Sequence, residues 1–213
     1  MCGETGSMPI LGEPAPDFEA LTTHGTVRLS DFKGKWLVLF SHPADFTPVC
    51  TTEFMAFSAI AEELKALNVQ LMGLSIDSVY SHLAWIRNIK EKMGVDIPFP
   101  IIADLDMKVA RKYGMIHPGQ SSTAAIRAVF FIDDKGILRA MIYYPLTAGR
   151  YMPEIVRLVK SLQTTDKYGV ATPANWQPGD KVVVPAPKNK EEMDRRLSEG
   201  YECKDWYLCF RKI

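Results

Sequence analysis

Hydrophobic and polar residues alternate with two different periods along most of the chain, and this pattern predicts an α/β fold. Short apolar runs at 36–40 and 69–76 are typical of buried parallel strands. Over 47–67 and 78–92, apolar residues recur every three or four positions, which indicates helices that pack by one face. Strands alternating with helices predict a sandwich of helices around a central sheet.

The pattern continues with smaller elements. A short strand is expected within 98–104 and a helix over 107–113. The runs at 124–132 and 137–145, joined by Asp-Asp-Lys-Gly, predict a β-hairpin, and an amphipathic helix follows over 153–162. Because a hairpin adds antiparallel strands to parallel ones, the sheet is expected to be mixed.

The hydrophobic pattern becomes irregular toward the C-terminus, where prolines and polar residues interrupt any regular period. We predict a globular domain over 9–163 and a C-terminal extension, acting as a dimerisation arm, over 164–213. Within this extension, 181–185 resembles a strand and 191–200 a short helix. Residues 1–8 are small and polar and are expected to be flexible.

Composition excludes several classes of protein. With 47% hydrophobic residues the chain can build a core, and 25 Lys+Arg against 25 Asp+Glu argue against a nucleic-acid binder. No apolar run approaches the roughly 20 residues that span a bilayer, and the start lacks signal-peptide features. Four cysteines are too few for a disulfide framework in 213 residues. We therefore expect a cytoplasmic protein, without membrane or nucleic-acid partners, that keeps its cysteines for chemistry.

The segment 41–53, SHPADFTPVCTTE, follows a buried strand and opens a helix. Thr47 suits the N-cap and Pro48 the first helical position, which places Cys50 in the first turn. Free backbone N–H groups and the helix dipole favour an anion there, so a thiolate could serve as a nucleophile. Position alone leaves a buried structural cysteine equally open.

The spacing P-x-x-x-T-x-x-C, formed by Pro43, Thr47 and Cys50, resembles the active-site motif of peroxiredoxins. Segments along the whole chain, among them GEPAPDFEALTTHG, GLSIDSVYSHLAWI and RAVFFIDDKG, are similar to the one-Cys type. The extension with two late cysteines is most similar to archaeal members. The resemblance implies a thioredoxin-like fold and a thiol-dependent peroxidase that reduces hydrogen peroxide and alkyl hydroperoxides without a cofactor, in an antioxidant role.

The resemblance also implies roles for single residues. Cys50 would be the peroxidatic cysteine, which attacks the O–O bond and becomes a sulfenic acid. Thr47 would hold the peroxide by hydrogen bonding, and Pro43 would shield the site from water. Arg127 matches the active-site arginine of the family and would stabilise the thiolate and the leaving oxygen. An arginine on a buried strand is costly without an anion beside it, which supports this role.

The resemblance implies that three further residues lie near this site. Glu53 and Arg150 are similar to the pair that orients the site, although they could equally form a surface ion pair. His42 precedes the motif proline and would lie near the sulfur and the peroxide, or it could be a packing residue. No CxxC or HxxxH spacing indicates a metal site. The remaining histidines are interpreted as structural: His24, His82 and His117.

Cys203 and Cys209 flank the sequence KDWYL near the end of the chain. A single strand would place both on one face, whereas a helical turn would split them. A thiol here could attack the Cys50 sulfenate and form a disulfide that a dithiol reopens. The resemblance implies that Cys203 resolves across a dimer with Cys209 as an accessory thiol. Alternatively the two bond to each other and external thiols reduce Cys50.

The partners expected from the resemblance are a hydroperoxide, a thioredoxin-like or small dithiol reductant, and a second copy of the chain. Homodimers would exchange their C-terminal arms and stack into a decameric ring. A redox sensor or chaperone that uses Cys50 only for signalling is an alternative. A thioredoxin-like disulfide reductase would need the missing CxxC, and Arg127 argues against a Cys–His hydrolase.

Overall fold

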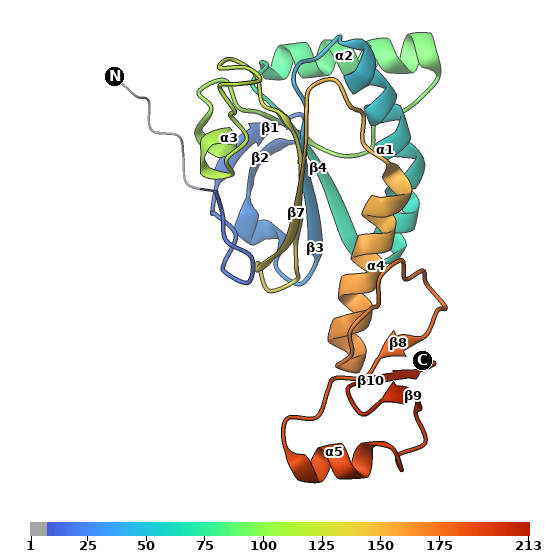
Figure 1. Cartoon of the computed structure of the whole chain (residues 1–213). Coiled ribbons are helices and arrows are strands. Elements are labelled where there is room, and N and C mark those ends of the chain that lie inside the picture. Colours follow the sequence, from blue (N-terminus) through green and yellow to red (C-terminus); the bar gives the residue numbers. More distant parts are fainter. Residues whose placement is uncertain (1–7) are drawn as a thin grey trace. The chain divides into compact units, whose positions relative to one another are not determined.

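The computed structural model describes residues 8–213, so Cys2 and most of the N-terminal segment 1–8 lie outside the described residues. The chain forms two compact units that divide between Met152 and Pro153. Figure 1 traces both units along the chain. None of the helices over 8–213 combines the length and apolar character that crossing a membrane requires.

The first unit is built on a mixed sheet, as the pattern predicted. Over the described residues the sheet has seven strands in the order β2-β1-β5-β4-β3-β6-β7. The central strand β3 pairs parallel with β4 and antiparallel with β6, and β4 pairs parallel with β5. The strands are β1 (Glu19–Thr22), β2 (Gly25–Arg28), β3 (Trp36–Ser41), β4 (Val69–Ser75), β5 (Ile101–Ala103), β6 (Arg127–Ile132) and β7 (Leu138–Tyr144).

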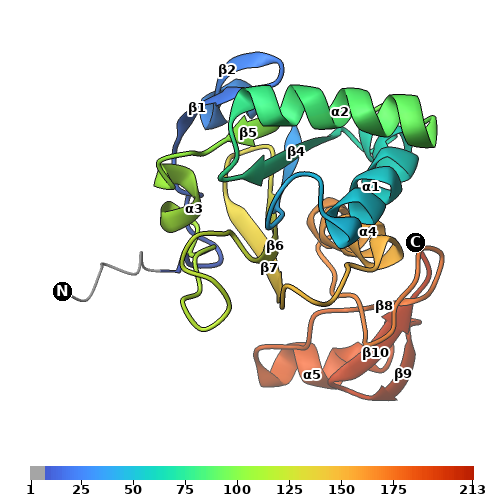
Figure 2. The ribbon, with the colours of Figure 1, turned by 90° about the horizontal axis from the view of Figure 1, so that it is seen from above.

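Helices cover both faces of this sheet. The helical elements of the first unit are η1 (Leu29–Phe32), α1 (Pro48–Ala66), α2 (Val79–Met93) and α3 (Lys108–Lys112). Figures 1 and 2 place α1 and α3 on opposite sides of the sheet. Side chains alternate accordingly along β3: Phe40 stacks on Phe57 of α1, whereas Leu39 joins the core cluster that contains Val109 of α3.

The long periodic elements were predicted correctly, and the short strand expected over 181–185 and the short helix expected over 191–200 correspond to Val182–Val183 and Lys190–Arg196. The hairpin of β1 and β2 was missed because its four-residue strands are mostly exposed and carry no apolar run. The predicted helix 153–162 ends too early, since the polar residues that follow do not break a helix before Gly169, whose φ is +60°. The predicted domain boundary at 163/164 falls inside this helix, and the division into 9–163 and 164–213 stays a prediction.

The second unit contains α4 (Met152–Tyr168) except for its first residue, α5 (Lys190–Arg196) and, in its described residues, a three-stranded sheet in the order β8-β10-β9. The strands are β8 (Val182–Val183), β9 (Glu202–Asp205) and β10 (Leu208–Arg211). Cys203 of β9 lies opposite Cys209 of β10, and the two are joined by a disulfide bond. The pair therefore lies neither on one strand nor in one helical turn, because the chain reverses between the two cysteines, and the alternative that they bond to each other is the arrangement found.

Candidate active site

Cys50 lies in the first turn of α1, fully buried, and it is the free cysteine of the described residues. Thr47 occupies the N-cap with extended backbone, and Pro48 begins the helix, as the sequence predicted. The Thr47 hydroxyl does not cap the helix, however, because its Oγ1 donates to the carbonyl of Ala44 at 2.9 Å. The backbone N–H groups of the first turn therefore do not donate a hydrogen bond to that side chain.

Arg127 is the first residue of β6 and reaches Cys50 from the sheet. Its Nη1 donates to Cys50 Sγ at 3.3 Å and to Glu53 Oε2 at 2.7 Å. Its Nε and Nη2 both donate to the carbonyl of Leu146, at 3.0 and 2.8 Å. The guanidinium is thus fixed on both sides and directed at the sulfur. Leu146 acts through its main chain, so no sequence signal could have identified it.

Glu53 and Arg150 form a buried pair, which excludes the alternative of a surface ion pair. Glu53 is 2% exposed and Arg150 is 7% exposed. Arg150 donates to Glu53 Oε1 from Nε at 2.8 Å and to Oε2 from Nη2 at 2.6 Å, and its backbone N–H also donates to Oε1. Its Nη1 donates to the carbonyls of Ser41 and Ala128. The pair therefore connects α1 with β3 and β6.

Glu53, Arg127 and Arg150 form a buried cluster with one more positive than negative charge when Cys50 is neutral. Burial raises the pKa of Glu53, but hydrogen bonds and charge from Arg150 outweigh it, so this pKa lies below its ordinary value. Burial lowers the pKa of Arg150, which Glu53 opposes. Among the described residues that touch the cluster, two guanidinium groups face one carboxylate. A thiolate at Cys50 would neutralise the remaining positive charge.

Ser41 ties the two central strands together beside Arg127. Its hydroxyl donates to the carbonyl of Ile126 at 2.6 Å and accepts the N–H of Ala128 at 3.1 Å. Because these bonds bracket Arg127, they fix where β6 begins relative to β3. A serine at the end of an apolar strand carries no sequence signal for this role.

His42 is fully buried and belongs to a network with a second histidine. Its Nε2 lies 2.9 Å from Asp45 Oδ1, and His82 Nδ1 lies 2.8 Å from Asp45 Oδ2. The ring of His42 packs against Phe54 and Trp85, with centroid distances of 4.7 and 5.2 Å. Neither Asp45 nor its contact with His82 was predicted, since 37 positions separate these two residues.

His42, Asp45 and His82 are also residue types that can bind a metal ion, and their ligand atoms lie within 4.8 Å of one another. The ring nitrogens that face Asp45 are already hydrogen-bonded to its carboxylate. His42 Nδ1, in contrast, is buried and has no hydrogen-bond partner among the described residues. The geometry therefore describes a hydrogen-bonded network with one unused acceptor position.

The structure thus brings together some predicted residues and not others. Cys50, Glu53, Arg127 and Arg150 are linked directly in the first unit. Half-buried Pro43 and Thr47 lie in the loop between β3 and α1. The cysteine pair of the C-terminal hairpin belongs to the second unit and is oxidised. The roles assigned to these residues remain predictions.

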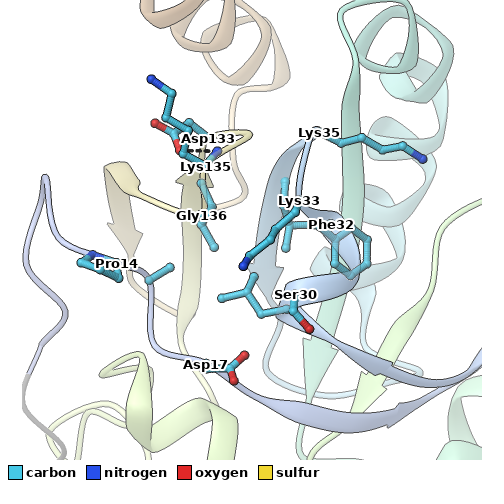
Figure 3. A pocket seen from close by; sticks show the side chains of 13 residues that line it. Pro14, Asp17, Ser30, Phe32, Lys33, Lys35, Asp133, Lys135 and Gly136 are labelled. Carbon is cyan, nitrogen blue, oxygen red and sulfur yellow. Dashed lines mark hydrogen bonds between the residues drawn. The ribbon is translucent and has the colours of Figure 1, made fainter.

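A separate cavity of about 280 Å³ lies at the beginning of β3, the end opposite to the strand terminus that leads to Cys50. Figure 3 shows the Lys33 side chain directed into the opening near Ser30, whereas Lys35 extends away from it. Asp133 on its rim accepts a hydrogen bond from the backbone N–H of Lys135. No residue predicted for the active site lines this cavity, so it is not part of the candidate site.

Two family models match the chain. Residues 11–141 match the AhpC/TSA family, and residues 161–200 match the C-terminal domain of 1-Cys peroxiredoxin. Curated relatives are bacterial as well as archaeal. A peroxiredoxin of Aquifex aeolicus is 62% identical and the alignment covers 99% of this chain and 100% of the relative. A peroxiredoxin of Methanosarcina mazei is 51% identical, with 96% and 98% covered.

Solved structures agree over nearly the whole chain. A yeast mitochondrial 1-Cys peroxiredoxin, studied for thiol resolution via the glutathione and thioredoxin systems, superposes with a TM-score of 0.87 at 41% identity and covers 97% of this chain and 100% of its own. A cysteine-to-serine mutant of Peroxiredoxin 6 of Arenicola marina has a TM-score of 0.86 at 40% identity. The match covers 96% of this chain and 98% of the mutant's chain. The expected thioredoxin-like fold with a C-terminal extension is confirmed. The chain belongs to the peroxiredoxin family and is a thiol-dependent peroxidase.

Proposed function

We propose that Cys50 is the peroxidatic cysteine of this peroxidase and that Arg127, Thr47 and Pro43 complete its site. The observation that carries the proposal is the buried guanidinium of Arg127, 3.3 Å from Cys50 Sγ, in a cluster with one unbalanced positive charge. An arginine held in this way favours the thiolate, which is the reactive form of cysteine.

The geometry suggests how the first step proceeds. The Cys50 thiolate attacks one peroxide oxygen, an S–O bond forms as the O–O bond breaks, and the leaving oxygen takes up a proton to become water or alcohol. Arg127 stabilises the charge that develops on that oxygen. The Thr47 hydroxyl donates its hydrogen bond to the carbonyl of Ala44, so its lone pairs stay available to accept the O–H of the peroxide. Pro43 limits the access of water.

We propose that Cys203 resolves the Cys50 sulfenic acid. Attack by the Cys203 thiolate forms a Cys50–Cys203 disulfide as the S–O bond breaks, and the expelled hydroxide takes up the proton that the Cys203 thiol released, giving water. Attack by Cys209 on Cys203 then frees Cys50 and leaves the tail pair oxidised. A chain in which Cys203 and Cys209 are bonded while Cys50 is free is the state that such a sequence would produce. A thioredoxin-like or small dithiol would return the pair to thiols.

The experiment is stopped-flow peroxide consumption with a dithiol, followed by mass spectrometry of the oxidised protein. Cys50→Ser is expected to lose turnover completely, which also separates the peroxidase from a chaperone that would keep holdase activity. Cys203→Ser is expected to stop at the sulfenic acid, and Cys209→Ser at the Cys50–Cys203 disulfide. Cys2→Ser serves as the matched control. Normal dithiol cycling by Cys203→Ser would contradict the resolving role.

We further propose that the enzyme works on hydrogen peroxide and alkyl hydroperoxides in a reducing, cytoplasmic compartment, as a homodimer that assembles into a decameric ring. The second unit carries the half-exposed pair Trp206 and Tyr207, which suits burial against another copy of the chain. Multi-angle light scattering of the reduced and oxidised protein tests the assembly, and a monomer in both states would contradict it.

A further inference from the structure

We propose that Gln120 is a positioning residue for Arg127. Its side-chain carbonyl binds the backbone N–H of Leu146 and thereby keeps the Leu146 carbonyl where it anchors the guanidinium. The inference rests on the proposed function, since it concerns the arginine that faces Cys50 in that proposal. Gln120 acts through the peptide backbone of another residue, so it is not a catalytic residue.

A continuous chain of hydrogen bonds leads from Gln120 to the sulfur of Cys50. Gln120 Oε1 accepts the N–H of Leu146 at 3.2 Å. The carbonyl of Leu146 accepts Nε and Nη2 of Arg127 at 3.0 and 2.8 Å. Nη1 of the same guanidinium donates to Cys50 Sγ at 3.3 Å. Because Leu146 is bonded through its donor on one side and its acceptor on the other, Gln120 and Arg127 fix its orientation together.

Leu146 lies just beyond the end of β7, where the sheet no longer binds the backbone. The strand ends at Tyr144 and lies at the edge of the seven-stranded sheet. Pro145 has no N–H, so Leu146 supplies the first backbone donor after the strand. A backbone donor needs a partner, and the side chain of Gln120 provides the acceptor that a neighbouring strand would provide within a sheet.

Gln120 is itself fixed by the loop that carries it. Its backbone N–H donates to the carbonyl of His117 at 2.8 Å, and His117 Nε2 lies 3.0 Å from the carbonyl of Gly114. The ring of His117 stacks on Tyr143 of β7, with a centroid distance of 5.6 Å. The loop is therefore held against the same strand that leads to Leu146, so the acceptor and the donor keep their relative positions.

Both ends of the segment that contains Leu146 are held without Gln120. At one end Tyr144 pairs with β6 in the sheet, and at the other the backbone N–H of Arg150 donates to Glu53 Oε1 at 2.9 Å. Loss of the Gln120 side chain should therefore release the peptide of Leu146 and leave the rest of the segment in place. Since Gln120 is exposed, its substitution should also leave the core intact.

The first test is the rate of Cys50 oxidation by hydrogen peroxide, measured by single-turnover stopped flow on the full chain. Gln120→Met keeps the length of the side chain but removes its carbonyl oxygen, and it should slow oxidation about threefold to tenfold, the effect of one hydrogen bond. Gln120→Glu keeps an acceptor oxygen and should stay within about twofold of the wild type. Ser121→Ala is the matched control in the same loop, because the Ser121 hydroxyl accepts the N–H of Thr123, and it should keep the wild-type rate.

The pH profile of the same rate distinguishes positioning from a general loss of structure. Within the described residues, the charged side chains of the cluster at Cys50 are Arg127, Glu53 and Arg150, and Gln120→Met changes none of them. A guanidinium that is held less firmly favours the thiolate less, so the midpoint of the profile should move to higher pH in Gln120→Met and return in Gln120→Glu. An unchanged midpoint in Gln120→Met would overturn the proposal.

Two further measurements decide whether Gln120 acts through Leu146 and Arg127. Hydrogen exchange of the Leu146 amide, followed by NMR, should be about threefold to tenfold faster in Gln120→Met and unchanged in Ser121→Ala. In an Arg127→Gln background, Gln120→Met should have little further effect on the rate, because both substitutions act on the same guanidinium. An equally protected Leu146 amide, or fully additive rate losses, would contradict the inference.

Failure of the proposed function gives a different result. If Cys50→Ser kept its turnover, the peroxidatic assignment would fall, whereas exchange of the Leu146 amide would still report whether Gln120 holds this peptide. If Cys50→Ser lost its turnover and Gln120→Met oxidised at the wild-type rate, the peroxidatic assignment would stand and the role of Gln120 would fall.

Discussion

The two cysteine regions of the chain are built in opposite ways. Cys50 is fully buried and is held among side chains that come from positions far apart in the sequence, such as Arg127, 77 residues away. Cys203 and Cys209 are six positions apart and face each other across a hairpin of two four-residue strands, of which β9 is mostly exposed and β10 is half-buried. The first region depends on the whole sheet, whereas the second depends on one local turn.

This difference matches what each region must do in the proposed cycle. A nucleophile gains from fixed charges around it, since groups that are already oriented need no reorganisation when the reaction occurs. A resolving thiol must move between partners, which favours an element that can open without unfolding the rest of the protein. The predictions below test whether the rigid site and the local hairpin are as independent as their construction indicates.

The largest expected effect is on the rigid site. Glu53→Gln removes the carboxylate that two buried guanidinium groups share, and loss of one partner of a buried pair typically lowers the free energy of unfolding by about 3–5 kcal/mol. Urea denaturation followed by circular dichroism measures this. Glu62→Gln, on the exposed side of the same helix, is the control and should change stability by less than about 0.5 kcal/mol. Equal effects of both variants would refute the idea of a buried charge cluster.

Arg127→Gln should lower the rate of Cys50 oxidation more than it lowers the stability of the fold. Removing one preorganised donor from a developing charge typically lowers a rate by about 100-fold to 1000-fold, so oxidation of Cys50 by peroxide should slow by this factor. Stopped-flow tryptophan fluorescence provides the rate. Arg28→Gln, whose exposed side chain pairs only with Glu19 among the described residues, should keep the wild-type rate. A rate loss below tenfold would show that Arg127 is mainly structural.

Reduction of the tail disulfide should act on the hairpin alone. Closing a loop this short stabilises by about 2 kcal/mol in the chain-entropy model, so reduction should speed hydrogen exchange in β9 and β10 by about 30-fold and leave β3 and β6 unchanged. Exchange mass spectrometry on Cys50→Ser, with and without reductant, makes the comparison. Faster exchange in the central strands would mean that the two regions are coupled.

The smallest expected effect is on the pH dependence of stability. The pKa of Glu53 is lower in the folded protein than its ordinary value of 4.5, so its contribution is fully present above that value and is lost as the pH falls through the folded pKa. Below pH 4.5 the wild type should therefore lose stability more steeply than Glu53→Gln. Urea titrations at a series of pH values measure the two slopes, and parallel slopes would argue against an ionised Glu53.

The motif and the long apolar periods were enough to predict the central strands, α1 and the position of Cys50, because these depend on local pattern. They could not reveal Ser41 or the Leu146 carbonyl, whose roles arise only when distant strands meet. The contact between Asp45 and His82 was equally unpredictable, since nothing in the sequence around either residue indicates the other. The tail hairpin of β9 and β10 was missed because each of its strands is only four residues long and has no clear apolar alternation.

The anchoring of Arg127 on the carbonyl of Leu146 has a consequence for how the site can vary. A peptide carbonyl is present whatever side chain stands at that position, so substitutions at 146 should be tolerated as long as the backbone keeps its path. Insertion or deletion of a residue between β7 and Arg150 would instead displace the acceptor and release the guanidinium. The length of this loop, more than its composition, is therefore the property on which the position of Arg127 depends.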